Sequence, residues 1–233
     1  QDKMTHLPDE RNPSLQGKTI GLPLQCWKSG TNAALLETVR MAISRLEERG
    51  ASVQEIDLPI LEAAIPCYYL LTSAEAASNL SRFDGIRYGP RAITDDLLET
   101  YLQTRSNRFG DEVQRRILLG TFALSKGYAT DLYSRANAVR QMMRDQMDEA
   151  LQGVDALAMP TTPSTAFPIG EKTTTPIDMY LSDIYTTPPS LTGHPALSIP
   201  AGEIDGLPVG LQLVGRYMDE AGILKLGLIA QAR

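Results

Sequence analysis

Residues Ile177–Arg216 read IDMYLSDIYTTPPSLTGHPALSIPAGEIDGLPVGLQLVGR and combine a helical beginning, a proline-rich kink and two strands. Pro188 and Pro189 lack the backbone N–H groups that a continuing helix requires. Ala196–Pro200 and Val209–Gly215 have the composition of strands, and turn-forming residues separate them. We therefore expect an interrupted helical segment followed by a β-hairpin.

Asp183 lies in the helical beginning of this stretch, and its neighbours are apolar: Met179, Tyr180, Leu181, Ile184 and Tyr185. An unpaired carboxylate is costly in apolar surroundings, so we expect hydrogen bonds or a cation at Asp183. His194 follows in the same stretch, and no acidic residue stands at a meaningful spacing from it. We interpret His194 as a structural residue and not a catalytic one.

The residues before this stretch predict a βαβ unit. Lys18–Leu24 and Ser52–Leu58 are short apolar runs typical of buried strands. Between them, Thr31–Arg49 carries apolar residues at the three-to-four spacing of an amphipathic helix, and Gly50 stands where a left-handed helix cap would need it. The crossover of such a unit is expected to be right-handed.

The middle of the chain is predicted to be helical. The expected helices are Pro66–Leu80, Asp95–Arg105, Asp111–Lys126 and Tyr128–Leu151, and a strand over Val154–Met159 follows them. Strands that alternate with helices indicate an α/β fold, with a mixed β-sheet flanked by helices. We divide the chain into a polar linker over residues 1–16 and a single α/β domain over residues 17–233.

Composition excludes several classes of protein. The chain has 233 residues, 42% of them hydrophobic, and a net charge of −6, which argues against a dominant nucleic-acid surface. Cys26 and Cys67 have no CxxC spacing, so neither a disulfide framework nor a zinc site is indicated, and a cytoplasmic setting is the default. No apolar run approaches the ~20 residues of a membrane span. Because the chain starts at Gln1 and stops at Arg233 within a helical pattern, we expect a piece of a longer protein.

The predicted helix Asp111–Lys126 is apolar nearly all round, which indicates a buried helix. Arg116 falls beside Gly120 and Ala123, small residues expected to leave space above the helix. A guanidinium keeps its charge and must meet an anion there, either a ligand or an internal carboxylate. The residues alone favour a structural role, either in an internal salt bridge or as a side chain that extends to solvent from the start of the helix, and the same interpretation covers Arg115.

The loop Pro160–Pro163 leaves a predicted strand at its carboxyl end, where open α/β sheets place ligands. Thr161 and Thr162 offer hydroxyl groups there, between two prolines that stiffen the loop. The loop is therefore a candidate lip of a cleft, and a rigid connector without a ligand is the alternative.

Several blocks of this sequence resemble the amidase-signature enzymes and, among them, the A subunits of glutamyl-tRNA(Gln) amidotransferases. The blocks are Arg82–Gly89, Phe109–Phe122, Met159–Pro163, Thr192–Gly202 and Gly206–Gly215. The likeness extends from about Gly17 to the end of the chain. It implies the carboxy-terminal part of an amidase-signature fold.

The resemblance also implies a substrate site. In the A subunits, a tyrosine, an arginine and an aspartate bind the α-amino and α-carboxylate groups of glutamine, and the matching motifs place these roles on Tyr68, Arg116 and Asp183. Tyr69 and Arg115 are the competing residues, because a shift of one residue would exchange them. The remaining expected partners are a missing amino-terminal half, the B and C subunits of the amidotransferase and, through the complex, tRNA.

No catalytic residue is expected in this chain. The family reaction resembles acyl transfer to a serine that a second serine and a lysine activate, and no segment here matches the motifs that carry those residues. The sequence also lacks GxSxG, SxxK, P-loop, GxGxxG and HExxH motifs, so no cofactor or metal is expected here, and ATP and Mg only in a partner subunit. The resemblance implies glutamine amide hydrolysis by the full-length protein and inactivity of this chain alone. The alternatives are another amide hydrolase of the family and a non-enzymatic binding domain.

Overall fold

The computed structural model describes residues 14–27, 31–125, 129–171 and 176–231. The chain divides into two compact units, one formed by Gln1–Ile65 with Arg140–Arg233 and the other by Pro66–Val139. The boundaries between the two units fall inside residues 17–233, which the sequence treated as a single domain. Leu15, which we assigned to the linker, is 1% exposed and belongs to the core of the first unit, whereas linker residues 1–13 lie outside the described residues.

The first unit contains a five-stranded sheet with the order β2-β1-β3-β5-β4. The strands are β1 (Thr19–Pro23), β2 (Ser52–Ile56), β3 (Ala156–Pro160), β4 (Ala196–Ile204) and β5 (Leu207–Val214). β1 pairs in parallel with β2 and β3, whereas β5 runs antiparallel to β3 and β4. The predicted mixed α/β sheet is confirmed.

Helix α1 (Ala33–Glu48) connects β1 to β2 and completes the predicted βαβ unit. The side chain of Asn32 accepts hydrogen bonds from the backbone N–H groups of Ala34 and Leu35, which satisfies donors that have no partner within the helix. Gly50 follows the helix with a φ of 96°, in the left-handed region that the sequence assigned to it.

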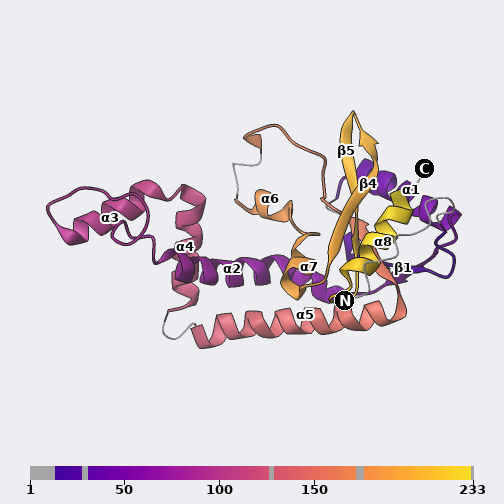
Figure 1. The fold of residues 1–233 in the computed structure, drawn as a ribbon, viewed down its shortest axis with the longest axis horizontal. Helices are drawn as coiled ribbons and strands as arrows, with labels where there is room; N and C mark the ends of the chain where they lie inside the picture. The colour runs from indigo at the N-terminus through magenta and orange to yellow at the C-terminus, as the bar shows by residue number, and fades with distance from the viewer. Residues whose placement is uncertain (1–13, 28–30, 126–128, 172–175, 232–233) are drawn as a thin grey trace. The chain divides into compact units, whose positions relative to one another are not determined.

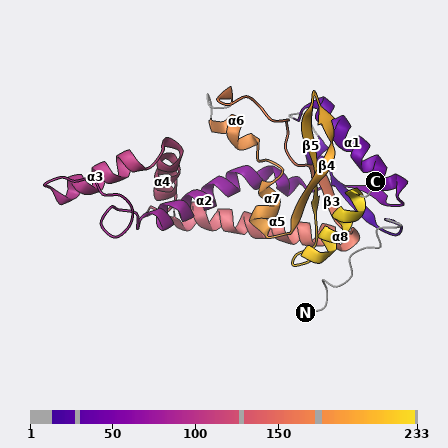
Figure 2. The ribbon, with the colours of Figure 1, turned by 45° about the horizontal axis from the view of Figure 1, so that its top comes forward.

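The predicted β-hairpin is present, and its strands are longer than expected (Figures 1 and 2). Asp205 and Gly206 form the turn with φ values of 51° and 76°. Positive φ at both central residues is typical of the tight turns that join twisted strands, and Asp-Gly tolerates this conformation well. A two-residue turn leaves more residues for the strands, which explains their greater length.

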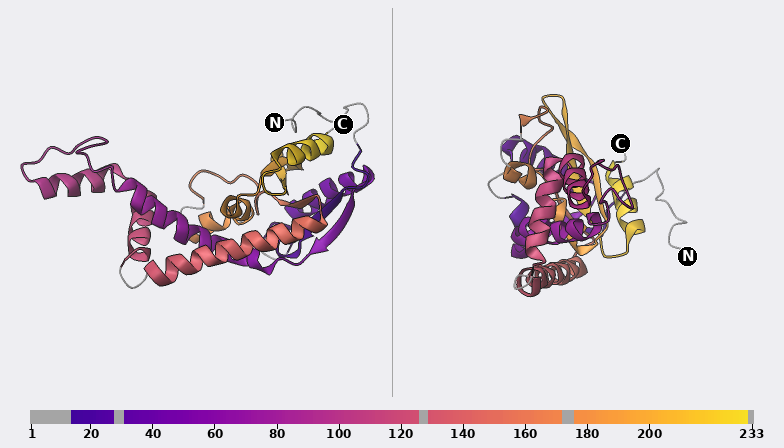
Figure 3. Two further views of the ribbon diagram at one scale, coloured as in Figure 1. Left: turned by 60° about the horizontal axis from the view of Figure 1, so that its bottom comes forward. Right: turned by 90° about the vertical axis from the view of Figure 1, so that its left-hand side faces the viewer.

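Helices cover both faces of the sheet. Helices α1 and α8 (Glu220–Gln231) pack on one face, and α5 (Ser134–Gly153) packs on the other (Figure 3). The central strand β3 shows why both faces are apolar: Ala156 and Ala158 point to the first face, whereas Leu157 and Met159 point to the second. Short helical turns complete the second face: η1 (Leu24–Trp27) and η2 (Pro59–Ala63).

Two short helices precede the hairpin, α6 (Pro176–Leu181) and α7 (Thr187–Thr192). We expected Pro188 and Pro189 only to interrupt a helix, and this expectation was incomplete because they form the first turn of α7. The first N–H groups of a helix have no partner within it, so proline costs no hydrogen bond there. Gly193 ends α7 with a φ of 79°.

The second unit is helical and contains most of α2 (Ala64–Leu80), α3 (Leu97–Arg108), α4 (Asp111–Ala123) and the π-helical turn η3 (Ala129–Tyr133). The expected ends of two helices, Lys126 and Tyr128, lie outside the described residues. Helix α4 crosses α2 closely (Figure 1). A Cβ atom on Gly120 would lie 1.9 Å from the carbonyl oxygen of Ser73. Gly120 therefore leaves no space above α4 for a ligand, and that expectation was wrong.

Large apolar side chains of α4 are exposed, so the prediction of a helix buried all round was also wrong. Leu118 is 71% exposed and Phe122 is 50% exposed. The helix is apolar nearly all round in sequence, but among its described residues Gly120 and Ala123 are buried whereas its large apolar side chains are not. Helix α3 has a similar arrangement, with Thr100 and Thr104 buried and its leucines exposed.

Candidate functional site

Tyr68, Tyr69 and Arg116 lie together in the second unit. The guanidinium of Arg116 lies over the ring of Tyr69, 5.3 Å from the ring centre, and the two tyrosine rings form an edge-to-face pair. Burial acts to lower the pKa of Arg116, but the hydrogen bond to Glu112 and the nearby tyrosines outweigh it, so the pKa is raised. Arg116 is therefore a permanent cation held against an aromatic ring.

The internal salt bridge that the residues favoured is present. Nε of Arg116 donates to Oε1 of Glu112 over 3.0 Å, at the i, i+4 spacing of a helix surface. Such pairs contribute only about 0.3–0.5 kcal/mol, so this one does not prevent the guanidinium from binding a second anion. The spacing of Glu112 could have identified this partner from the sequence.

The binding capacity of this cluster is only partly used. Nη1 and Nη2 of Arg116 have no hydrogen-bond partner within the described part of the chain, and neither does the hydroxyl of Tyr68. Tyr69 is only 8% exposed and lies against the guanidinium, while Arg115 is paired with Glu112 on a more exposed side. Tyr68 and Arg116 therefore keep polar groups that are available for further hydrogen bonds among the described residues.

Asp183 belongs to the first unit, so the structure describes the predicted substrate site as two separate parts, each within its own unit. We expected the carboxylate to be surrounded by apolar groups, but Asp183 is exposed because it lies in the turn between α6 and α7. Its carboxylate has no partner among the described residues. The apolar neighbours in the sequence point elsewhere, since Tyr185 is buried while Met179 and Leu181 are exposed.

The threonine loop lies after β3 as predicted. Oγ1 of Thr161 lies 2.7 Å from Oγ of Ser198 on β4, and Gly210 on β5 leaves the room that this hydroxyl pair needs. The hydroxyl of Thr162 instead donates to the carbonyl oxygen of Ser164 over 2.8 Å and stabilises the loop itself. No pattern in the sequence marks Ser198, because the contact joins residues on strands far apart in the chain.

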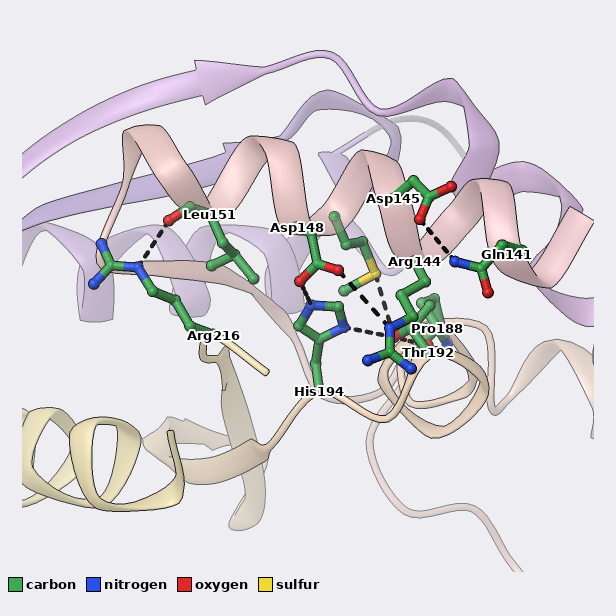
Figure 4. Close-up of polar contacts among 10 residues, drawn as sticks. Gln141, Arg144, Asp145, Asp148, Leu151, Pro188, Thr192, His194 and Arg216 are labelled. Carbon is green, nitrogen blue, oxygen red and sulfur yellow. Dashed lines mark hydrogen bonds and ion pairs between the residues drawn. The ribbon is translucent and has the colours of Figure 1, made fainter. Parts of the chain in front are cut away.

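His194 is buried between α5 and the end of α7 (Figure 4). Its Nε2 lies 3.2 Å from Oδ1 of Asp148 and its Nδ1 lies 2.8 Å from Oγ1 of Thr192. Nearby, the guanidinium of Arg144 lies 3.9 Å from the ring centre of Tyr217. Asp148 is the acid that no sequence spacing indicated. These contacts fasten the segment between α7 and β4 to α5.

The stability of the first unit is expected to decrease as the pH falls below about 6.5 because His194 is buried. Burial lowers the pKa of His194, although Asp148 acts in the opposite direction. The unfolded chain then binds the proton more tightly, so the free energy of unfolding has its full value above the unfolded pKa, begins to fall as the pH drops below that pKa, and keeps falling until the pH has passed the lower folded pKa. The measurement is the thermal midpoint of wild-type and His194→Gln full-length protein from pH 8 to pH 5. The advantage of the wild type should shrink towards pH 5, and a constant difference would contradict the prediction.

The described residues give little support to a metal site, a reactive thiol or a membrane-spanning helix. Within the described ranges, no group of three or more His, Cys, Asp and Glu side chains could hold a metal ion. Cys26 and Cys67 are buried, and burial raises the pKa of the Cys26 thiol to about 12, so this thiol is a poor nucleophile. None of the described helices combines the length and the apolar character needed to cross a membrane.

Known proteins resemble this chain in sequence and in fold. A profile of the family described as Amidase matches residues 1–224. The A subunit of glutamyl-tRNA(Gln) amidotransferase from Hahella chejuensis is 49% identical over 214 residues, which are 91% of this chain and 44% of that protein. Its counterpart from Halorhodospira halophila is 49% identical over 217 residues, 93% of this chain and 45% of that protein. The chain thus spans less than half the length of these curated relatives.

Solved structures show the same likeness. The crystal structure of the glutamyl-tRNA(Gln) amidotransferase A subunit from Thermotoga maritima matches with a TM-score of 0.70 and 32% identity, over 94% of this chain and 43% of that chain. A crystal structure of an amidase matches with a TM-score of 0.74 and 28% identity, over 94% of this chain and 46% of that chain.

Proposed function

This chain belongs to the amidase family, and from that premise we propose that it forms the glutamine-recognising part of an amidotransferase A subunit. The observation that carries the proposal is the 49% identity to one such protein over 91% of the chain. Because the chain spans less than half of its relatives, the activity, substrate and partners of the whole protein are part of the proposal.

Each proposed binding residue has a group that suits one end of glutamine. The terminal nitrogens of Arg116 offer a planar fork to the α-carboxylate, and the hydroxyl of Tyr68 supports the same end. The exposed carboxylate of Asp183 accepts hydrogen bonds from the α-ammonium group. A site that pairs both charged groups can reject analogues that lack one by a factor of roughly 10⁴.

The bond-breaking step takes place on residues outside this chain. A serine attacks the side-chain amide of glutamine, the C–N bond breaks, ammonia leaves, and water releases glutamate from the acyl-enzyme. B and C subunits receive the ammonia and convert Glu-tRNA(Gln) to Gln-tRNA(Gln), with ATP and Mg bound by a partner subunit. In this proposal the complex is cytoplasmic and the chain contacts tRNA only indirectly.

We expect the 233-residue chain alone to release no ammonia from glutamine, because it contains none of the serine and lysine motifs that the reaction requires. The measurement is ammonia release from the purified chain, with the full-length protein and its partner subunits as the positive control. Turnover by the chain alone that disappears in the Asp183→Ala variant would contradict the division of roles proposed here.

A different amide hydrolase of the family is the second candidate, and the TM-score of 0.74 to a solved amidase favours it. The two candidates differ in substrate. The full-length protein should be assayed with glutamine, asparagine, aryl amides and aliphatic amides. Preference for glutamine by a factor of at least about 100 supports the amidotransferase proposal, whereas preference for an amide without charged α-groups supports the second candidate.

A further inference from the structure

Asp183 lies in a turn that hydrogen bonds hold in place. The backbone carbonyl oxygen of Asp183 accepts from the N–H of Thr187 over 3.0 Å and from the hydroxyl of Thr187 over 2.8 Å. Thr187 itself is 3% exposed. The backbone of this turn is therefore fixed although the Asp183 carboxylate is in solvent.

Tyr185 attaches this turn to the sheet. Its backbone carbonyl oxygen accepts from Nε2 of Gln212 on β5 over 2.7 Å, and Gln212 is buried. Its hydroxyl donates to the carbonyl oxygen of Cys26 over 3.2 Å and also contacts the hydroxyl of Thr31. A phenol has one hydrogen, so the Tyr185 oxygen accepts from Thr31 while its hydrogen goes to Cys26. Both partners lie in the connection between β1 and α1.

The side chain of Tyr185 is also packed on the sheet. It is 6% exposed and belongs to the apolar cluster on the α5 face of the sheet. Its ring is thus held by packing and its hydroxyl by two polar partners. Together these contacts restrict the positions that the turn can adopt. They therefore also restrict the position of the Asp183 carboxylate, two residues earlier in the chain.

We propose that Tyr185, held by Gln212 and by Thr31, is the positioning residue for the Asp183 carboxylate and thereby sets how well the protein recognises the α-ammonium group of its amide substrate. The inference rests on the proposed function, because it assigns Tyr185 a role through Asp183. A carboxylate on a restrained turn loses less conformational freedom when it binds a ligand than one on a mobile loop. Tyr185 itself touches no substrate in this arrangement.

The test compares glutamine with glutaramate, which is glutamine without its α-amino group, in the full-length protein assembled with its partner subunits. The readout is the ratio of kcat/KM for the two substrates. This ratio does not depend on the amount of correctly folded enzyme, so a partial loss of folding in a variant does not affect it. Tyr185→Phe removes the hydroxyl contacts, and we expect the ratio to fall about fivefold to tenfold, because the turn must then be ordered when the ammonium group binds.

Three further variants complete the experiment. Thr31→Val removes one partner of the Tyr185 hydroxyl and should lower the ratio in the same direction. Tyr217→Phe removes a hydroxyl from an exposed tyrosine of the same unit and should leave the ratio unchanged. In the Asp183→Ala background, Tyr185→Phe should have no further effect on the ratio, because the group that it positions is absent.

The outcomes separate the two proposals. An unchanged ratio in Tyr185→Phe, or a decrease that adds fully to that of Asp183→Ala, overturns the positioning role and leaves the proposed function intact. An unchanged ratio in Asp183→Ala itself overturns the proposed function, and the positioning role falls with it.

Discussion

Asp183→Ala in the full-length protein is expected to raise the KM for glutamine roughly 10- to 100-fold and to change kcat much less. The Asp183 carboxylate is exposed and has no partner among the described residues, so its proposed role is to bind an ammonium group. A hydrogen bond to a charged group contributes about 1.5–3 kcal/mol, which corresponds to this range of affinity. Steady-state kinetics of glutamine hydrolysis measure both parameters.

The stability of Asp183→Ala decides what the kinetic change means. Because the Asp183 carboxylate makes no hydrogen bond or ion pair with a described residue, the thermal midpoint of the variant should stay within about 1 °C of that of the wild type. Glu149→Ala is a matched control, since Glu149 is an exposed carboxylate on α5 without a described partner. Equal losses of stability and activity in Asp183→Ala would instead assign the carboxylate a structural role.

Gly120→Ala is expected to destabilise the second unit by a net of about 1–2 kcal/mol, although alanine is the better helix former. Alanine within a helix gains about 1 kcal/mol over glycine from propensity alone. Against this gain, the new Cβ would lie 1.9 Å from the carbonyl oxygen of Ser73 and 2.8 Å from Cβ of Ala77. These are backbone and Cβ atoms that no rotamer change can move, so α2 and α4 must separate, and overpacking of this kind costs about 1–3 kcal/mol or more.

Two measurements on the full-length protein test this effect. Chemical denaturation gives the change in the free energy of unfolding, and hydrogen exchange shows whether the change lies in α2 and α4. Gly110→Ser is the matched control, because a Cβ on Gly110 meets nothing within 4 Å. Gly110 is the N-cap of α4 and has no side-chain hydrogen bond, so serine should stabilise the helix by a few tenths of a kcal/mol. If Gly120→Ala proves as stable as the wild type, the contact between α2 and α4 is looser than described.

The predicted substrate residues differ in how far the sequence could place them. Motif likeness identified Tyr68 and Arg116 together, and the structure brings them together in one unit. Glu112, the partner of Arg116, stands at a helical spacing that the sequence displays. The contact of His194 with Asp148 joins residues 46 positions apart and has no local signal.

The exposure of Asp183 shows the limit of arguing from neighbours in sequence. Its apolar neighbours indicated an apolar environment, but the turn between α6 and α7 directs the Tyr185 ring into the core and leaves the carboxylate in solvent. A residue's surroundings depend on which elements cover it, and those elements come from distant parts of the chain.

The amino-acid sequence by itself determined the local features of this protein. The left-handed cap at Gly50 and the Asp205-Gly206 turn depend on the conformational preferences of a few adjacent residues, and residue type marks them directly. Hydrophobic periodicity marked the helix of the βαβ unit. Tertiary structure alone decided which apolar sides of α4 are covered, how closely Gly120 approaches Ser73, and how Tyr185 holds the turn of Asp183. These features depend on contacts between residues far apart in the chain, and hydrophobic periodicity specifies an apolar face without specifying its partner.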